Sequence, residues 1–101
     1  MLSSNTSANA ASKRLNPNSS QYIFKRGLEK FEQADFDGAI ADFTQVIEID
    51  PNYVDAYIQR GLAKYSLEDY EGSIADFTQV IEIDPNYVDA YIQRGLAKYS
   101  L

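Results

Sequence analysis

The 101-residue sequence contains neither cysteine nor histidine. Without cysteine, the chain can form no disulfide and no thiolate metal site. Without histidine, it lacks the side chain that most often acts as a general base or as a metal ligand. No nucleophile can be activated by a His or Cys partner either. We therefore expect no enzymatic activity, no metal site and no cofactor.

Basic residues are scarce, with 9 Lys and Arg against 15 Asp and Glu, for a net charge of -6. Only Lys13 and Arg14 are charged in residues 1–20, so the remaining 81 residues hold 15 acids against 7 bases, a net charge of -8. A surface of this sign repels phosphate backbones, which argues against a nucleic-acid partner. Carboxylates can perform acid–base chemistry, but the repeated Asp50 and Asp84 are typical of solvated helix ends.

Long apolar runs are missing as well, and a membrane span needs about 20 such residues. Residues 1–5 lack the basic region and the apolar run of a secretory signal. We therefore expect no membrane association and a cytoplasmic location. Residues 1–19, rich in Ser, Asn and Ala, are predicted to form a flexible tail, with Ser19 or Ser20 capping the first helix.

The sequence does contain a repeat. Residues 40–67 have the sequence IADFTQVIEIDPNYVDAYIQRGLAKYSL, and residues 74–101 copy all 28 letters at an offset of 34. A weaker copy lies upstream, where residues 24–28 match residues 58–62 at the same offset. The identity of the copies indicates either a recent duplication or deliberate construction, and both origins stay open.

Within each repeat, the spacing of apolar residues predicts two helices. The first covers residues 54–67, with Asn52 as its expected cap and Asp55 as the reciprocal partner three residues later. The second covers residues 70–83, with Asp69 as its expected cap. Because a Pro-Asn turn separates one pair from the next, the sequence predicts an all-α chain of antiparallel helical hairpins.

The recurring residues resemble the tetratricopeptide repeat (TPR) family, in an array of the bacterial type. The shared features are an aromatic residue early in helix A, a Gly four residues later, small and aromatic residues in helix B, and a closing Pro. They are Tyr57, Gly61, Tyr65, Tyr70, Ser73, Phe77 and Pro85, with Gly27, Phe31, Phe36, Ala39, Phe43 and Pro51 before them and Tyr91, Gly95 and Tyr99 after. The resemblance implies an α-α superhelix over residues 20–101, with full repeats at about 20–53 and 54–87 and helix A of a third at 88–101.

Some positions depart from the family pattern. The family's Leu before Gly is Arg26, Arg60 or Arg94 here, and its Gly in the A–B turn is Ala34 or Glu68. Arg60 and Arg94 are predicted to pair with helix B acids such as Asp42 and Asp76, rather than to bind a ligand. Gly61 and Gly95 are predicted to let a partner helix approach closely.

The first repeat carries Tyr22 and Glu29 where the later ones carry Ala56 and Ala63. A carboxylate cannot be buried cheaply against an apolar helix. We therefore expect the array to begin at this repeat.

The resemblance also implies a concave groove lined by helix A residues, which would bind a peptide or a partner helix. Carried over one by one, the groove positions are Phe24, Leu28, Phe31, Asp55, Ile58, Gln59, Leu62, Tyr65, Asp89, Ile92, Gln93 and Leu96. Such a groove is apolar with an acidic edge, and it suits apolar anchors accompanied by basic residues. Family members that grip acidic chaperone tails use Lys, Asn and Arg at such positions, so this groove argues against that ligand.

An alternative function is self-assembly into a homo-oligomer with no external ligand. The last helix copies an internal helix, so its outer side is not adapted to water. An exposed apolar patch tends to find a partner, either a second chain or a further repeat. The residues predicted to form that patch are Tyr91, Gly95, Tyr99 and Leu101.

Overall fold

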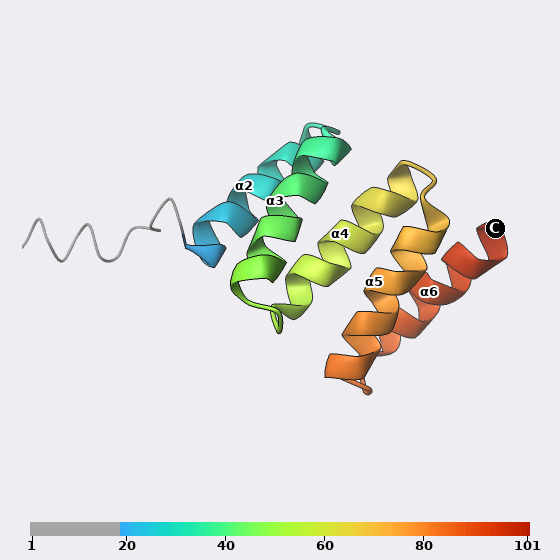
Figure 1. Cartoon of the computed structure of the whole chain (residues 1–101). Coiled ribbons are helices and arrows are strands. Elements are labelled where there is room, and N and C mark those ends of the chain that lie inside the picture. Colours follow the sequence, from blue (N-terminus) through green and yellow to red (C-terminus); the bar gives the residue numbers. More distant parts are fainter. Residues whose placement is uncertain (1–18) are drawn as a thin grey trace, which may run out of the picture.

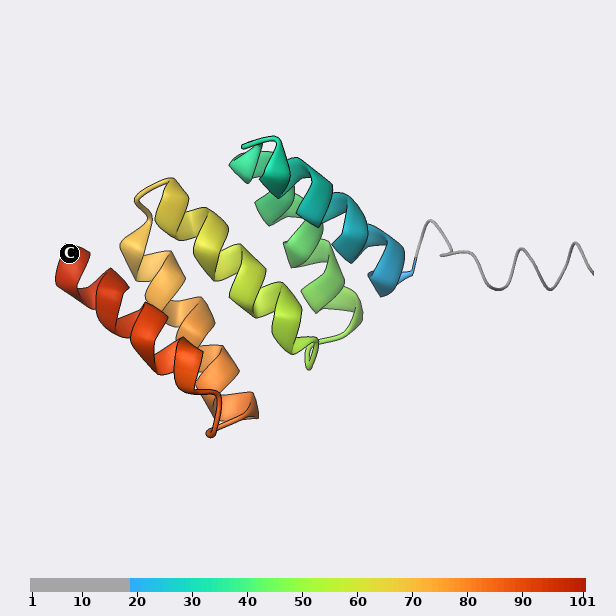
Figure 2. The same ribbon diagram turned by 180° about the vertical axis from the view of Figure 1, so that it is seen from behind.

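The computed structural model describes residues 19–101, and within that range it contains five helices and no strand (Figure 1). These are α2 (Ser20–Glu32), α3 (Phe36–Ile49), α4 (Val54–Ser66), α5 (Tyr70–Ile83) and α6 (Val88–Ser100). Helices α2 and α3 form one antiparallel hairpin, α4 and α5 form a second, and α6 follows alone (Figures 1 and 2). The prediction of an all-α superhelix with two hairpins and a further helix is confirmed. The tail predicted for residues 1–19 lies outside the described residues, apart from Ser19.

Three helices begin at side-chain caps. The Ser19 hydroxyl accepts a hydrogen bond from the backbone N–H of Tyr22 at 3.2 Å, which caps α2. Asp69 accepts one from the N–H of Gly72 at 3.0 Å and caps α5, as predicted. Asp35 caps α3 in the same way. Each cap satisfies an N–H group that has no partner inside its helix.

The predicted cap of α4 is wrong. Helix α4 begins after Tyr53, and no side chain caps it. The Asp50 carboxylate instead accepts a hydrogen bond from the N–H of Asn52 at 3.1 Å, and the Asp50 carbonyl accepts one from Tyr53 at 3.1 Å. Because this turn places Asn52 two residues before the helix, its side chain does not cap α4, and Asp55 has no reciprocal role.

One glycine in each hairpin allows its two helices to pack closely. A Cβ atom on Gly61 would lie 2.9 Å from Cε2 of Phe77, and one on Gly27 would lie 2.6 Å from Cε1 of Phe43. Both distances are shorter than a carbon–carbon contact allows. Gly95 differs, since a Cβ there would meet nothing within 4 Å. The close-approach prediction therefore holds for Gly61, while α6 has no equivalent neighbour among residues 19–101.

Small residues fill the contact between one hairpin and the next helix. Ala56, Ala63, Ala90 and Ala97 are buried, and they lie on the A helices α4 and α6. The first A helix has Tyr22 and Glu29 at equivalent places, and both are exposed. Their exposure agrees with the absence of a preceding helix in the described part of the chain.

A buried carboxylate joins the two helices of each hairpin. In the first, Arg26 binds Asp42 at 2.8 Å and Lys30 binds it at 3.1 Å. Burial works to raise the pKa of Asp42, but hydrogen bonds from Arg26 and Lys30 and their positive charges outweigh burial, so the pKa falls below its usual value. In the second hairpin, Arg60 binds Asp76 at 2.7 Å. The ion-pair interpretation of Arg60 is thus confirmed.

Arg60 also reaches the preceding hairpin, where its Nη1 donates a hydrogen bond to the Thr44 hydroxyl at 3.1 Å. Arg94 repeats only this second contact, at 3.4 Å from Thr78. The carboxylate partner predicted for Arg94 is wrong, because among residues 19–101 no helix B follows α6 to supply one.

Candidate peptide-binding groove

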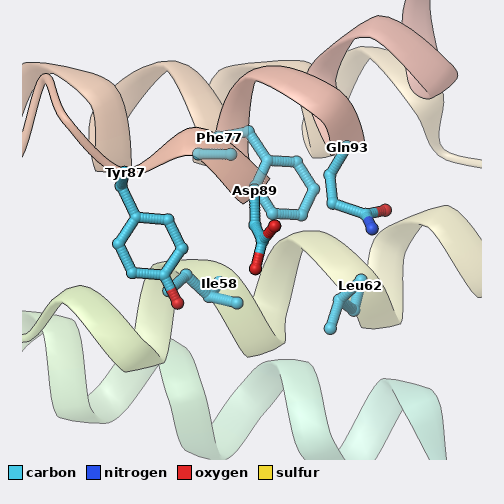
Figure 3. Close-up of a pocket in the computed structure, with 7 residues that line it drawn as sticks. Ile58, Leu62, Phe77, Tyr87, Asp89 and Gln93 are labelled. Atoms are coloured by element: carbon cyan, nitrogen blue, oxygen red, sulfur yellow. The ribbon is translucent and has the colours of Figure 1, made fainter.

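Helices α4 and α6 flank a small pocket of about 160 Å³. Ile58 and Leu62 project into it from α4, and Phe77 of α5 closes it behind (Figure 3). From the other side, Asp89 and Gln93 point from α6 toward α4 (Figure 3). The pocket is therefore apolar at its base and polar at its α6 edge. Tyr87 and Ala90 complete the lining.

The first repeat arranges the equivalent space differently. Phe24 occupies the position that Ile58 holds one repeat later. Its ring lies 5.5 Å from the ring of Phe43 and 5.1 Å from that of Tyr53. These residues are the equivalents of Phe77 and Tyr87. The larger ring at position 24 therefore fills space that Ile58 leaves open.

Negative charge surrounds the groove. Asp55 and Asp89 are both exposed, in the first turns of α4 and α6. Burial raises the pKa of the Tyr53 phenol, and the charges of Asp55 and Asp50 raise it further. The carboxylates of Asp55 and Asp89 would therefore attract a cationic group that enters the groove.

The structure brings four of the predicted groove residues to one pocket, namely Ile58, Leu62, Asp89 and Gln93. The others lie elsewhere along the A helices. Phe24 and Leu28 pack on the core of the first hairpin, and Gln59 is half-buried.

Phe31 and Tyr65 make contacts near the ends of their helices, outside the pocket. The Phe31 ring lies edge-on to Phe36 at 5.3 Å, and the Tyr65 hydroxyl is hydrogen-bonded to Ser100 at 3.1 Å. Ile92 and Leu96 are about half exposed on α6, at 54% and 48%. Neither contributes to the pocket.

Three residues that line the pocket were not predicted, namely Phe77, Tyr87 and Ala90. Phe77 belongs to helix B and Tyr87 to the turn after it, whereas the family's groove positions lie on helix A. The signal that could have identified Tyr87 is its recurrence as Tyr53 directly before an A helix.

Two further properties concern residues 19–101 only. No group of three or more Asp and Glu side chains within them is arranged to hold a metal ion. In the same part of the chain, no helix combines the length and the apolar character that crossing a membrane would require.

The helical hairpins, the 34-residue period and the groove together define a helical repeat protein of the TPR class. The chain belongs to the TPR family, because a family model described as a TPR repeat matches residues 27–68 and 61–101. No curated protein sequence matches this chain.

Several solved structures share the fold. The chain is 31% identical to the TPR2B domain of yeast Sti1, in a complex with pHsp70, with a TM-score of 0.76 over 80% of this chain and 65% of that one. It is 28% identical to the TPR domain of Arabidopsis OM64, with a TM-score of 0.80 over 85% and 71%. It is 27% identical to MamA, with a TM-score of 0.81 over 85% and 47%. The chain thus spans less than two thirds of the Sti1 and MamA structures.

Proposed function

We propose that the groove between α4 and α6 binds a peptide or partner helix through one apolar anchor side chain. TPR domains are protein-interaction modules, and the observation that supports this site is the open pocket lined by Ile58, Leu62 and Phe77. A cavity of about 150 Å³ lined by apolar side chains can accommodate a benzene ring. The pocket is therefore large enough for one aliphatic or small aromatic side chain. We propose that this binding involves no catalytic step. The cytoplasmic location stays a prediction.

The charge of the groove favours a basic ligand. Asp89 stands at the rim of the pocket, and Gln93 beside it offers an amide that can bond to a peptide backbone. Residues 21–101 carry a net charge of -8, from 15 acids and 7 bases. A peptide with Lys or Arg next to its anchor would be attracted, and an acidic tail would be repelled. For this reason we do not propose that this chain binds pHsp70, the partner of the Sti1 domain.

The proposal is tested with two labelled peptides that carry a single leucine, one flanked by lysines and one by glutamates. Fluorescence anisotropy should show tighter binding of the lysine peptide. Replacing its leucine by alanine should weaken binding about tenfold or more, because burial of a leucine contributes about 1.5–3 kcal/mol.

Two variants of the chain distinguish the pocket from the rest of the surface. Ile58→Phe should close the pocket by copying the arrangement of Phe24 in the first repeat, so it should reduce affinity without loss of helicity. A double change, Ile58→Glu with Leu62→Glu, should abolish binding. If the lysine peptide binds the Ile58→Phe chain as tightly as the original, the pocket is not the site.

A second candidate function is self-association through the outer side of α6. The observation that favours it is the exposure of Tyr99 at 92% and Leu101 at 68%. Tyr91 is 44% exposed, and Gly95 between them is open. Sedimentation across a range of concentrations tests this candidate. A monomer that persists at the highest concentration would exclude it.

A further inference from the structure

The sequence places a leucine directly beside a basic residue at one point only. Leu15 follows Lys13 and Arg14, whereas every other leucine of the chain has uncharged or acidic neighbours. These three residues, which we call the basic segment, precede the first helix. A leucine next to lysine or arginine is also the ligand that the groove between α4 and α6 suits. The chain therefore carries, in its own sequence, a segment with the chemistry of that ligand.

The groove offers a counterpart for each part of the basic segment. Ile58, Leu62 and Phe77 line the base of the pocket, where a leucine side chain would be buried. Asp89 points from α6 toward α4 (Figure 3), and Asp55 is exposed in the first turn of α4. These carboxylates would attract the two cations of the segment, so the segment and the groove are complementary in charge as well as in polarity.

The pocket is complete within the described helices. Its walls come from α4, α5, α6 and the turn before α6, so its shape depends on no residue that follows α6. In the first repeat, Phe24 fills the corresponding space and packs on Phe43 and Tyr53. Each copy of the chain thus brings this groove and one basic segment.

The basic segment is too short to fill the groove of its own chain. Ser19 caps α2, and Leu15 lies four residues before it, so Leu15 can lie at most about 14 Å from the start of α2. Helix α4 stands between α2 and the groove (Figures 1 and 2).

The distance to the pocket follows from the helix geometry. Packed helices are about 8–10 Å apart, so the far side of α4 lies about 12–15 Å across from α2. Ile58 and Leu62 lie one to two turns into α4, about 6–12 Å along it. The direct path is therefore about 16 Å, and even a fully extended segment stops short of the pocket. The segment of another copy has no such limit.

We propose that the basic segment of one copy occupies the groove of a second copy. Leu15 enters the pocket, and the cations of Lys13 and Arg14 lie beside the carboxylates of Asp55 and Asp89. The inference rests on the proposed function, because the segment uses the pocket of the peptide ligand. Two copies that exchange segments reciprocally form a closed dimer.

This contact makes the groove sensitive to the concentration of the chain. At low concentration the grooves are free to bind a peptide ligand. At high concentration the basic segments of other copies fill them, so a ligand has to compete with self-association. An excess of ligand should in turn dissociate the assembly, because both occupy the same pocket.

Sedimentation of the full chain across a range of concentrations measures the association. The average mass should rise with concentration, and the association should weaken at high salt, which screens exposed charges. Leu15→Ala should raise the dissociation constant about tenfold or more, because it removes the buried anchor. Leu2→Ala is the matched control, since residues 1–12 contain no Lys or Arg, and it should leave the association unchanged.

A mixture of two variants is the decisive measurement. The Leu15→Ala chain keeps its groove, and the Ile58→Phe chain keeps its basic segment but has a closed pocket. Each variant alone should stay largely monomeric at concentrations where the original chain associates. When the two are mixed and one is labelled, the labelled chain should sediment with the other. Circular dichroism should show that Leu15→Ala keeps full helicity, because Leu15 lies outside helices α2 to α6.

A labelled peptide of residues 10–18 separates failure of this proposal from failure of the groove. The peptide should bind the Leu15→Ala chain, as the lysine-flanked leucine peptide should. If only the lysine-flanked peptide binds, the groove is a binding site but the basic segment is not its occupant. If neither binds, the proposed function fails together with this inference.

Two other results would overturn the proposal. Self-association that neither Leu15→Ala nor Ile58→Phe weakens would place the contact elsewhere on the surface, for example on the outer side of α6. A mixture of the two variants that stays monomeric would exclude exchange between copies. If Leu15→Ala then bound the lysine peptide more tightly than the original chain at every chain concentration, the segment would occupy its own groove instead.

Discussion

Alanine placed at Gly61 and at Gly95 should have opposite effects on stability. The two glycines occupy the same position in identical 13-residue helices, so the intrinsic gain from replacing glycine by alanine, about 1 kcal/mol, is the same for both. Gly95→Ala should therefore stabilise α6. At Gly61 the new Cβ would lie 2.9 Å from the Phe77 ring and 3.3 Å from Cβ of Asp76, so the hairpin must open slightly.

The size of the difference follows from the packing. Overfilling a packed core costs about 1–3 kcal/mol, and this cost applies to Gly61→Ala alone. After the helix-propensity gain is subtracted, Gly61→Ala should be neutral to destabilising by about 2 kcal/mol. The two variants should then differ by about 1–3 kcal/mol, and each kcal/mol corresponds to about 4–8 °C in Tm for a domain of this size.

Thermal and urea unfolding, followed by circular dichroism, measure this difference directly. Gly27→Ala provides an internal replicate, because its Cβ would approach Phe43 even more closely, at 2.6 Å. It should be at least as destabilising as Gly61→Ala. If Gly61→Ala and Gly95→Ala raise Tm by equal amounts, close approach of helix B is not the reason for glycine at this position.

Three further predictions concern the hairpins. Ser73→Ala should stabilise the chain by about 1 kcal/mol in urea unfolding, because the buried Ser73 hydroxyl has no hydrogen-bond partner among the described residues; a loss of stability would reveal one. Glu68→Gly and Ala34→Gly should each raise the free energy of unfolding by up to about 1 kcal/mol, because both residues hold a positive φ, at 63° and 61°, that glycine adopts without steric cost; a lower urea midpoint in both variants would contradict this reasoning. Because the pKa of Asp42 is lowered in the folded chain, its ionised form stabilises the fold fully above the ordinary carboxyl pKa of 3.8, and this stabilisation is lost as the pH falls from 3.8 toward the lower folded pKa. When the pH is lowered below 3.8, the urea midpoint of Asp42→Asn should therefore decrease less steeply than that of the original chain.

Much of the fold could be predicted because the evidence for it is local and repeated. The helix pairs follow from the spacing of apolar residues, and the Asp69 cap follows from a residue type next to its own helix. The ion pair of Arg60 could be predicted because the pair recurs with the repeat. Each of these features depends on one hairpin and not on the rest of the array.

The errors have a different origin, because they depend on which neighbour is present. Asn52 was expected to cap α4, but its backbone N–H donates a hydrogen bond to the Asp50 carboxylate, and this contact fixes the turn. Arg94 was expected to find a carboxylate, but its equivalent partner lies on a helix that residues 19–101 do not contain.

The pocket was only half predicted for the same reason. Its α4 and α6 walls are helix A positions, whereas Phe77 and Tyr87 come from the helix and the turn between them. Helical spacing on a single helix carries no information about what lies behind it.

The position of Arg60 has a consequence for how the array unfolds. One guanidinium group joins three successive helices, since it binds Thr44 of α3 and Asp76 of α5 from its place on α4. If the second hairpin melts, the first loses a hydrogen bond and is left with an uncovered end. Unfolding of one hairpin alone therefore costs additional free energy, so neighbouring hairpins should unfold together. This is the nearest-neighbour cooperativity of a one-dimensional chain.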